Sequence, residues 1–556
     1  MKKILLLFVA SILLFGCNKK DEMDLIKIID YVREQVAPIN EEAGTAYWNG
    51  TITGNPEEFE KYTNNNIKIN SILSNKETFE KLKKLKEHGR INNPLLKRQL
   101  DVLYNSFLGN QVDTVLLNKI SKKETALEQK YAEYRAVYKG NPINDNKVEE
   151  ILRTSVNNKD LEEVWLAHKG IGKLVAADII EIVKLRNEVA KSLGYNNFHT
   201  MSLMLSEQDP DEISALFDEL DLMTRDGFTK LKAEIDMNFA KRYGVKAEEL
   251  MPWHYQGRYF QEAPNLYPID LDKYYTGKNL EKLTIDFYKG IGLDISSIMQ
   301  NSDLYPKNNK NQHAFCIDIN RNGDVRVLCN VTDNEQWMGT MLHEFGHGIY
   351  SLGHDSAGNP YFLRDAAHTF TTEGVAMLFG RLSRNPQWMK QMLGLTDIEY
   401  NAIAENCIKS TRLQQLVFSR WVQVVYRFEK EMYANPDQDL NNLWWDLVEK
   451  YQMLKRPANR NEPDWASKIH IALYPCYYHN YQLGELFASQ MHYYIVNNIS
   501  KSKDYKNECY IGNNAIGLWM QEYIFNPGMR YPWNEMIKNA TGEKLTAKYY
   551  KMQFVD

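Results

Sequence analysis

The sequence predicts a mostly α-helical protein with one short antiparallel β-hairpin beside a helix that binds metal. Three observations lead to this fold class. Apolar residues recur at three- and four-residue steps through most of the 556 residues, which is typical of helices. Residues 312–331 alternate instead, as paired strands do. Residues 339–351 contain His-Glu-x-x-His, which places two imidazoles on one face of a helix.

The expected helices are separated by asparagine and glycine residues, which favour helix ends and turns. From about residue 25 to residue 237 nearly every segment is expected to be helical. Residues 250–274 are rich in aromatic residues, proline and glycine, so we expect a loop on the surface or along a cleft. The clearest helices are predicted at residues 57–88, 94–108, 112–138, 147–154, 161–194, 210–238, 371–382, 397–435, 440–455 and 481–498.

The hairpin is expected to turn at Asn322-Gly323, a pair that favours a two-residue type I′ turn. This register places Cys316 opposite Cys329 at a non-hydrogen-bonded position, where Cα atoms lie about 4.5 Å apart. A disulfide between these cysteines is therefore predicted, in an oxidising compartment. A β-bulge that shifts the register would instead leave two small buried thiols.

The first residues have the features of an export signal. A basic start is followed by an apolar stretch, residues 4–15, that is too short to span a bilayer as a mature helix. It ends Leu14-Phe15-Gly16-Cys17, which resembles a bacterial lipoprotein signal, whose cysteine becomes the lipidated N-terminus. We expect a signal peptide over 1–16, lipid on Cys17, a tether over 17–24 and a single domain of two helical subdomains over 25–556. An ordinary secretory signal is the alternative.

These features place the protein in the bacterial cell envelope, outside the cytoplasm. A lipid anchor in the outer membrane or at the surface is favoured over one in the inner membrane. The net charge is only −5, so nothing in the composition calls for a nucleic-acid partner.

His343 and His347 are the predicted ligands of one Zn²⁺ ion per chain, and Glu344 is the predicted general base. Apolar residues surround this helix on most sides, so it should be buried, and buried histidines need partners. Zinc needs a third protein ligand and an open position. The longer motif with a third histidine does not fit, because His354 comes one residue too late. Glu373, 26 residues beyond His347, is the predicted third ligand.

Residues 468–481 carry a dense set of hydrogen-bond donors. Hydrolysis of an amide needs such donors, because the tetrahedral intermediate carries an oxyanion. His470, Tyr478 and Tyr481 are the candidates for this role.

Taken together, the chain resembles the angiotensin-converting-enzyme-like zinc peptidyl-dipeptidases over most of residues 30–540. The resemblance implies a two-lobed, helical zinc metallopeptidase of the gluzincin type with a deep cleft. It also implies the release of dipeptides from the C-termini of oligopeptides. The segments that carry the resemblance are residues 46–53, 185–190, 313–314, 343–347, 373, 444–445, 450–452 and 468–470.

The resemblance also suggests how substrate is held. By position, Lys468 would bind the terminal carboxylate of the peptide, and Gln256 is a candidate for a second contact there. His313 and Ala314 would lie along the peptide backbone, and His470 would stabilise the intermediate.

The chain departs from the family at several positions. Met377 replaces the acidic residue that usually orients a zinc histidine, so another group must do this. The family's chloride-linked arginine has no counterpart in residues 477–480, so chloride activation is not expected. The spacing from His470 to the tyrosines is closer to that of thimet-type oligopeptidases, which leaves the choice between Tyr478 and Tyr481 open. Two alternative functions therefore remain: an oligoendopeptidase with the same chemistry, and a catalytically idle peptide-binding lipoprotein.

Overall fold

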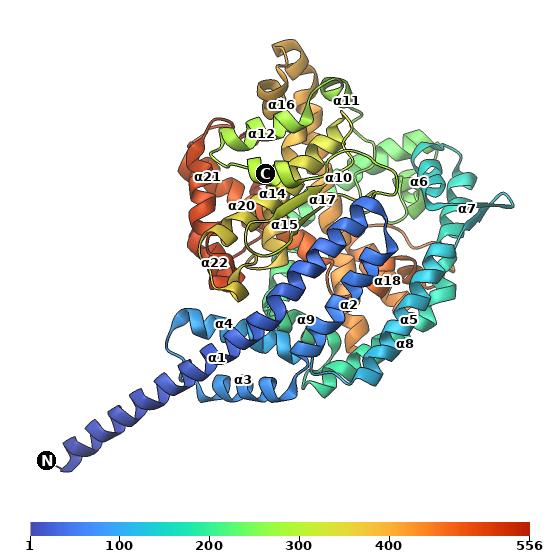
Figure 1. The fold of residues 1–556 in the computed structure, drawn as a ribbon. Helices are drawn as coiled ribbons and strands as arrows, with labels where there is room; N and C mark the ends of the chain where they lie inside the picture. Colours follow the sequence, from blue (N-terminus) through green and yellow to red (C-terminus); the bar gives the residue numbers. More distant parts are fainter. Residues whose placement is uncertain (1) are drawn as a thin grey trace.

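The computed structural model describes residues 2–556 and, from Lys19 onward, their side chains. The described residues form helices throughout, with two short antiparallel hairpins. Figure 1 shows the helices packed around a central group that includes α14 (Glu335–Ser356), α15 (Thr369–Gly380) and α17 (Asp397–Ala434). The predicted fold class, mostly α with a small hairpin beside the metal helix, is confirmed.

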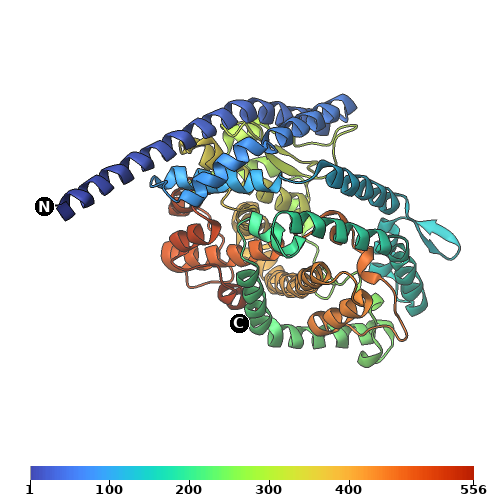
Figure 2. The same ribbon diagram turned by 90° about the horizontal axis from the view of Figure 1, so that it is seen from below.

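Four N-terminal helices cover one side of the molecule, as Figure 2 shows. They share an apolar cluster of their own, which includes Leu25, Leu82 and Phe107. Two acidic residues attach the start of this group to the helices beside it: Asp21 contacts His88 at 3.1 Å, and Glu22 accepts hydrogen bonds from two backbone N–H groups. The predicted tether is therefore helical and docked in its described part. The four helices are α1 (Lys2–Thr53), α2 (Pro56–Leu73), α3 (Lys76–His88) and α4 (Pro94–Gly109).

Polar side chains begin most of the following helices. Asn157 and Asp209, for example, each accept bonds from N–H groups of the first turn, as capping residues do. The single helix predicted at residues 161–194 is interrupted at Gly170, and the one at 57–88 is interrupted at Asn75. A small hairpin, β1 (Ala136–Tyr138) and β2 (Asn141–Ile143), was not predicted. The helices are α5 (Thr114–Glu133), α6 (Asp145–Thr154), α7 (Asn158–Lys169), α8 (Ile171–Ser192), α9 (Phe198–Leu205), α10 (Pro210–Tyr243), α11 (Asp272–Tyr275), α12 (Leu280–Gly290) and α13 (Ser296–Asn301).

The second hairpin, β3 (Phe315–Asp318) and β4 (Val325–Leu328), has a different register from the predicted one. Cys316 pairs with Val327, not with Cys329. Residues 319–324 connect the two strands, and the side chains of Asp318 and Asn320 accept hydrogen bonds from backbone N–H groups of this longer loop. Cys316 and Cys329 are free thiols, so the predicted disulfide is wrong.

The C-terminal third completes the core around the metal helix. One large apolar cluster extends from Leu127 to Phe554 and joins α14, α15 and α17. The 3₁₀ turn η4 (Arg381–Arg384) follows α15 directly. The remaining helices are α16 (Pro386–Leu393), α18 (Leu440–Leu447), α19 (Ile469–Leu473), α20 (His479–Tyr494), α21 (Asn514–Met520), α22 (Trp533–Thr541) and α23 (Lys548–Phe554).

Candidate metal centre and substrate cleft

Two histidines on α14 and one glutamate on α15 converge at a single point. The Nε2 atoms of His343 and His347 lie 3.2 Å apart. The Oε2 atom of Glu373 lies 3.7 Å from the first and 3.8 Å from the second. Two imidazoles and one carboxylate are the donor set of a catalytic zinc site, which leaves a fourth position open. The three predicted ligands are thus brought together in an arrangement that fits zinc.

Close contacts at glycine residues allow α14 and α15 to bring these ligands together. A Cβ added to Gly346 would lie 3.0 Å from the Cα of Ala376, and one added to Gly380 would lie 3.2 Å from the Cβ of His343. Helices approach this closely only where side chains are absent. The spacing of glycines therefore sets the distance between the histidines and Glu373.

The ring of His347 is fixed from behind by Thr372. The hydroxyl of Thr372 lies 2.7 Å from Nδ1 of His347, while Nε2 faces the other ligands. A bond to the far nitrogen orients a ligand ring, a role often filled by a carboxylate. The sequence predicted that some group other than Met377 must do this, and the structure shows that the group is the neighbour of Glu373. Met377 packs against Gly484.

Glu344 lies buried beside the metal ligands. Its carboxylate accepts a hydrogen bond from the backbone of Cys316, so β3 supports the predicted general base. Burial, and then the charge of Glu373, raise the pKa of Glu344 to about 8. Burial, and then Glu485, raise the pKa of Glu373 to about 7. Burial lowers the pKa of His343 to about 4 and that of His347 further below its usual range. A divalent cation would favour the charged carboxylates and neutral imidazoles that ligation requires.

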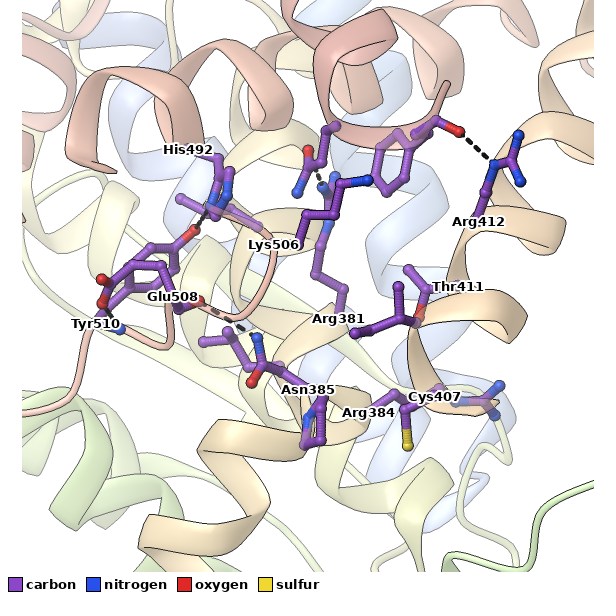
Figure 3. Close-up of a pocket in the computed structure, with 16 residues that line it drawn as sticks. Arg381, Arg384, Asn385, Cys407, Thr411, Arg412, His492, Lys506, Glu508 and Tyr510 are labelled. Carbon is purple, nitrogen blue, oxygen red and sulfur yellow. Dashed lines mark hydrogen bonds between the residues drawn. The ribbon is translucent and has the colours of Figure 1, made fainter. Parts of the chain in front are cut away.

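An ion pair between Glu485 and Arg381 lies near Glu373. Glu485 on α20 pairs with Arg381 and accepts a hydrogen bond of 2.9 Å from the Gln415 side chain. Arg381 also bonds Gln553 and lines a small cavity of about 80 Å³. Figure 3 shows the side chains that line this cavity. The arginine thus pairs with the charge of Glu485 beside the metal site.

Lys468 is a buried lysine that has a polar partner and aromatic neighbours but no ion-pair partner. Its ammonium donates to Oε1 of Gln261 at 2.7 Å. It lies 5.1 Å from the ring centre of Tyr259, 5.6 Å from that of Trp421 and 5.4 Å from that of Tyr478. Among the described residues, no carboxylate comes within 4.0 Å of it, the limit for an ion pair. Burial, and then the charge of Arg258, lower the pKa of Lys468 to about 8.

The two candidate tyrosines have different surroundings. Tyr478 lies against Lys468, and its hydroxyl accepts a bond of 2.9 Å from the Trp421 indole. Tyr481 lies on α20, which contacts Glu373 through Gly484, and after burial the charge of Glu373 is the largest influence that raises the pKa of Tyr481. The two rings are 5.4 Å apart. Tyr481 is therefore the better placed of the two to reach an oxyanion at the metal.

His470 lies beside Tyr478 and is influenced by the charge of Lys468. Its ring centre is 5.3 Å from that of Tyr478, and its Nδ1 atom is buried without a hydrogen-bond partner. Burial, and then Lys468, lower the pKa of His470 to about 4. A neutral imidazole with an unpaired nitrogen is available to bind a group that enters the site.

Comparison with known proteins decides the family. A sequence profile of the peptidase family described as angiotensin-converting enzyme matches residues 19–552. The chain belongs to the angiotensin-converting enzyme family. It is 22% identical to Carboxypeptidase 1 of Bacillus subtilis (strain 168), over 96% of both chains. It is 22% identical to Thermostable carboxypeptidase 1 of Pyrococcus furiosus, over 66% of this chain and 71% of that one. It is also 22% identical to Angiotensin-converting enzyme of Mesocricetus auratus, over 71% of this chain but 32% of that protein.

Membership of the angiotensin-converting enzyme family makes this chain a peptidase, and it accounts for the scattered segments recognised in the sequence. None of the described helices combines the length and the apolar character needed to cross a bilayer. The predicted lipidation of Cys17 concerns a side chain that lies outside the described residues.

Two of the substrate contacts predicted from the family resemblance lie just ahead of β3. His313 and Ala314 directly precede the strand that supports Glu344. His313 is exposed, and the amide of Ala314 is only one residue from the ladder. Their contact with substrate stays a prediction.

A different glutamine from the predicted one accompanies Lys468. The side chain of Gln256 accepts a bond of 2.7 Å from the backbone of Asn265, while Gln261 bonds Lys468. The structure therefore favours Gln261 over Gln256 for the contact near the carboxylate. A cavity of about 720 Å³ extends from Gln261 to Arg381 at the edge of the metal site. Sequence reasoning missed Gln261 because its partner is 207 residues away.

Proposed function

We propose that the protein is a zinc peptidyl-dipeptidase that releases dipeptides from the C-termini of oligopeptides. The observation that carries this proposal is Lys468, a buried ammonium that has no carboxylate partner in the described part of the chain. A charged group in such a place is costly unless a partner joins it. The free carboxylate of a peptide supplies that partner, and a charge-assisted bond of this kind contributes about 1.5–3 kcal/mol.

Each residue of the site has a role in this reaction. His343, His347 and Glu373 would hold the zinc ion, which when bound polarises the scissile carbonyl and makes water more acidic. Glu344 takes a proton from the attacking water and passes it to the departing amine.

The remaining groups bind the substrate and the intermediate. His470 and Tyr481 donate hydrogen bonds to the oxyanion. Lys468 and Gln261 hold the terminal carboxylate at a fixed distance from the cut.

The proposal is tested by comparing a peptide acid with its C-terminal amide. Amidation removes the charge that Lys468 would bind and leaves the scissile bond unchanged. We expect the amide to lose roughly 10- to 150-fold in kcat/KM, as a charge-assisted bond predicts. Lys468→Met, which keeps the apolar stem, should lose activity on the acid and discriminate little between the two, because the coupling is direct. Lys450→Ala, at an exposed position, is the control. Equal cleavage of acid and amide at internal sites by the wild type favours an oligoendopeptidase.

A second candidate function is favoured by the printed names of two relatives, which are carboxypeptidases. Such an enzyme would release single amino acids by the same chemistry. Mass spectrometry of the products from a mixed peptide pool separates the three outcomes: dipeptides, amino acids or internal fragments. A protein that binds peptides but yields no product is the catalytically idle alternative.

We also propose that Cys17 carries lipid and anchors the enzyme in the cell envelope. The support is the sequence Leu14-Phe15-Gly16-Cys17 after a short apolar stretch. A peptidase held outside the cytoplasm would meet peptides from the surroundings, which suits the proposed substrates.

A further inference from the structure

The segment that carries His470 and Tyr481 bends at a break between two helices. The last regular bond of α19 runs from the N–H of Tyr474 to the carbonyl of His470, at 3.0 Å. In a continuing helix the next donors would be residues 475 and 476. Pro475 has no N–H to give, and Cys476 has a φ of +56°, a conformation that non-glycine residues rarely adopt.

Two buried side chains take over the hydrogen bond that is lost at this break. In a continuing helix the N–H of Cys476 would bond the carbonyl of Ala472. Instead, the N–H of Cys476 donates to Oε1 of Glu429 at 2.8 Å. The carbonyl of Ala472 accepts from Nη2 of Arg186, also at 2.8 Å. The N–H of Cys476 and the carbonyl of Ala472 therefore both have hydrogen-bond partners, although they do not bond each other.

These two side chains are buried and hydrogen-bonded. Arg186 is 3% exposed and Glu429 is 2% exposed. Arg186 also bonds the hydroxyl of Tyr433 at 3.0 Å, and Asn187 bonds the carbonyl of that residue at 2.9 Å. Helix α8 is therefore tied to α17, which carries both Glu429 and Tyr433. The segment at residues 185–190 was recognised in the sequence without a role, and this contact supplies one.

We propose that Arg186 and Glu429 form a positioning pair that sets His470 and Tyr481 at their working separation. The proposal rests on the proposed function, in which these two residues hold the oxyanion. His470 lies before the break and Tyr481 after it, so the opening between Ala472 and Cys476 fixes one relative to the other. A shift of about 1 Å in such groups can cost 100-fold in rate. Lys468 is held separately by Gln261, so substrate binding should not depend on the pair.

The test compares two substitutions of Glu429. Glu429→Leu removes the acceptor for Cys476, whereas Glu429→Gln keeps an oxygen in the same place. In the leucine variant we expect kcat to fall roughly 10- to 100-fold, with KM changed by less than about threefold and zinc content unchanged. The glutamine variant should stay within about threefold of wild type in kcat. A general loss of stability would not lower kcat while leaving KM unchanged, and it would not explain why glutamine restores kcat.

Asp221→Leu is the matched control. Asp221 is another buried carboxylate that bonds α17, through Arg420, but it is not linked to the break. Its loss should lower the melting temperature and leave kcat of the folded fraction at the wild-type value.

A third substitution tests the strain at the break directly. Cys476→Gly, combined with Glu429→Leu, should recover part of kcat, because glycine adopts a positive φ without cost. If Glu429→Leu does not fold, Arg186→Lys makes the same test, since the single nitrogen of lysine cannot take the places of both Nη1, which bonds Tyr433, and Nη2, which bonds Ala472. Wild-type kcat in Glu429→Leu or in Arg186→Lys overturns the proposal, and so does a glutamine variant as slow as the leucine one. If the wild type itself cleaves no peptide, the proposed function is wrong, and this result is distinguishable from a failure of the positioning proposal.

Discussion

At the scale of single residues, the hydroxyl of Thr372 is the support of His347. Thr372→Val keeps the shape of the side chain and removes its hydrogen bond. We expect zinc affinity to fall by about 10- to 100-fold, as is typical when the partner of a ligand histidine is lost. Competition with a chelator measures this, and Thr369→Val, at an exposed position of the same helix, is the control. Unchanged affinity would show that the helix alone orients the ring.

Glu344 should be separable from metal binding. Glu344→Gln removes the proton acceptor and leaves the three ligands intact. We expect near-stoichiometric zinc by elemental analysis, and a loss in kcat of about 10²–10⁴, the contribution of general-base catalysis. Normal turnover in this variant would exclude Glu344 as the base.

Lys468 should impose a pH dependence on substrate binding. Because its pKa is lowered to about 8, the ammonium is charged below that pH and becomes neutral above it. The attraction for a carboxylate is therefore present at pH 7 and is lost as pH rises past 8. We expect KM for a peptide acid to increase between pH 7 and pH 9, while KM for the amide stays level. A parallel rise for both substrates would point to another group.

The sequence predicted the site residues that lie close to one another along the chain. His343, Glu344 and His347 share one helix turn, and Glu373 follows on the next helix of the site. Thr372 and Gln261 were not predicted, since their roles depend on which segments meet in space. A threonine and a glutamine carry no signal of their own in a sequence.

At the scale of elements, glycine contacts set how closely the helices of the site approach. Gly374 on α15 and Gly484 on α20 face each other, so that a Cβ on Gly484 would lie 3.2 Å from the Cβ of Glu373. This contact brings α20, and with it Tyr481, beside the metal ligand. The glycine of His-Glu-Phe-Gly-His has the same function between α14 and α15.

Gly346→Ala should therefore disturb the metal site without touching a ligand. The added methyl would lie 3.0 Å from a backbone atom of α15, which cannot turn aside as a side chain can. We expect weaker zinc binding and a lower melting temperature, because metal distances tolerate only about 0.2 Å. Gly109→Ala, where the nearest atom is a side-chain carbon at 3.5 Å, is the control. If Gly346→Ala binds zinc as tightly as the wild type, then α14 and α15 can move apart without disturbing the metal ligands.

The β3–β4 hairpin shows where local sequence signals fail. The strands were predicted from their alternation, but the turn was placed at the pair Asn322-Gly323. Backbone N–H groups of a longer loop donate to the side chains of Asp318 and Asn320, and the register is shifted by two positions. The cysteines thus fail to face each other, although each lies in the predicted hairpin region.

At the scale of the whole molecule, the N-terminal helix links the proposed anchor to the catalytic body. Cys17→Ser should move the enzyme from the membrane fraction to the soluble envelope fraction. Immunoblotting of the two fractions measures this, with peptidase activity as the control for folding. A variant that fractionates like wild type would refute the anchor.

If Lys468 binds the C-terminal carboxylate as proposed, its separation from the metal triad determines which bond is cut, counted from the C-terminal end of the substrate. On the dipeptide proposal, each cut exposes a new carboxylate that can occupy the same place, so trimming advances in steps of two. Two peptides that differ by one residue at the C-terminal end are then cut at alternate bonds and share no dipeptide products. Cyclic peptides and peptides with a blocked C-terminus, which cannot pair with Lys468, would be poor substrates. The charge on Lys468 would thus decide which of two alternate sets of peptide bonds is cut.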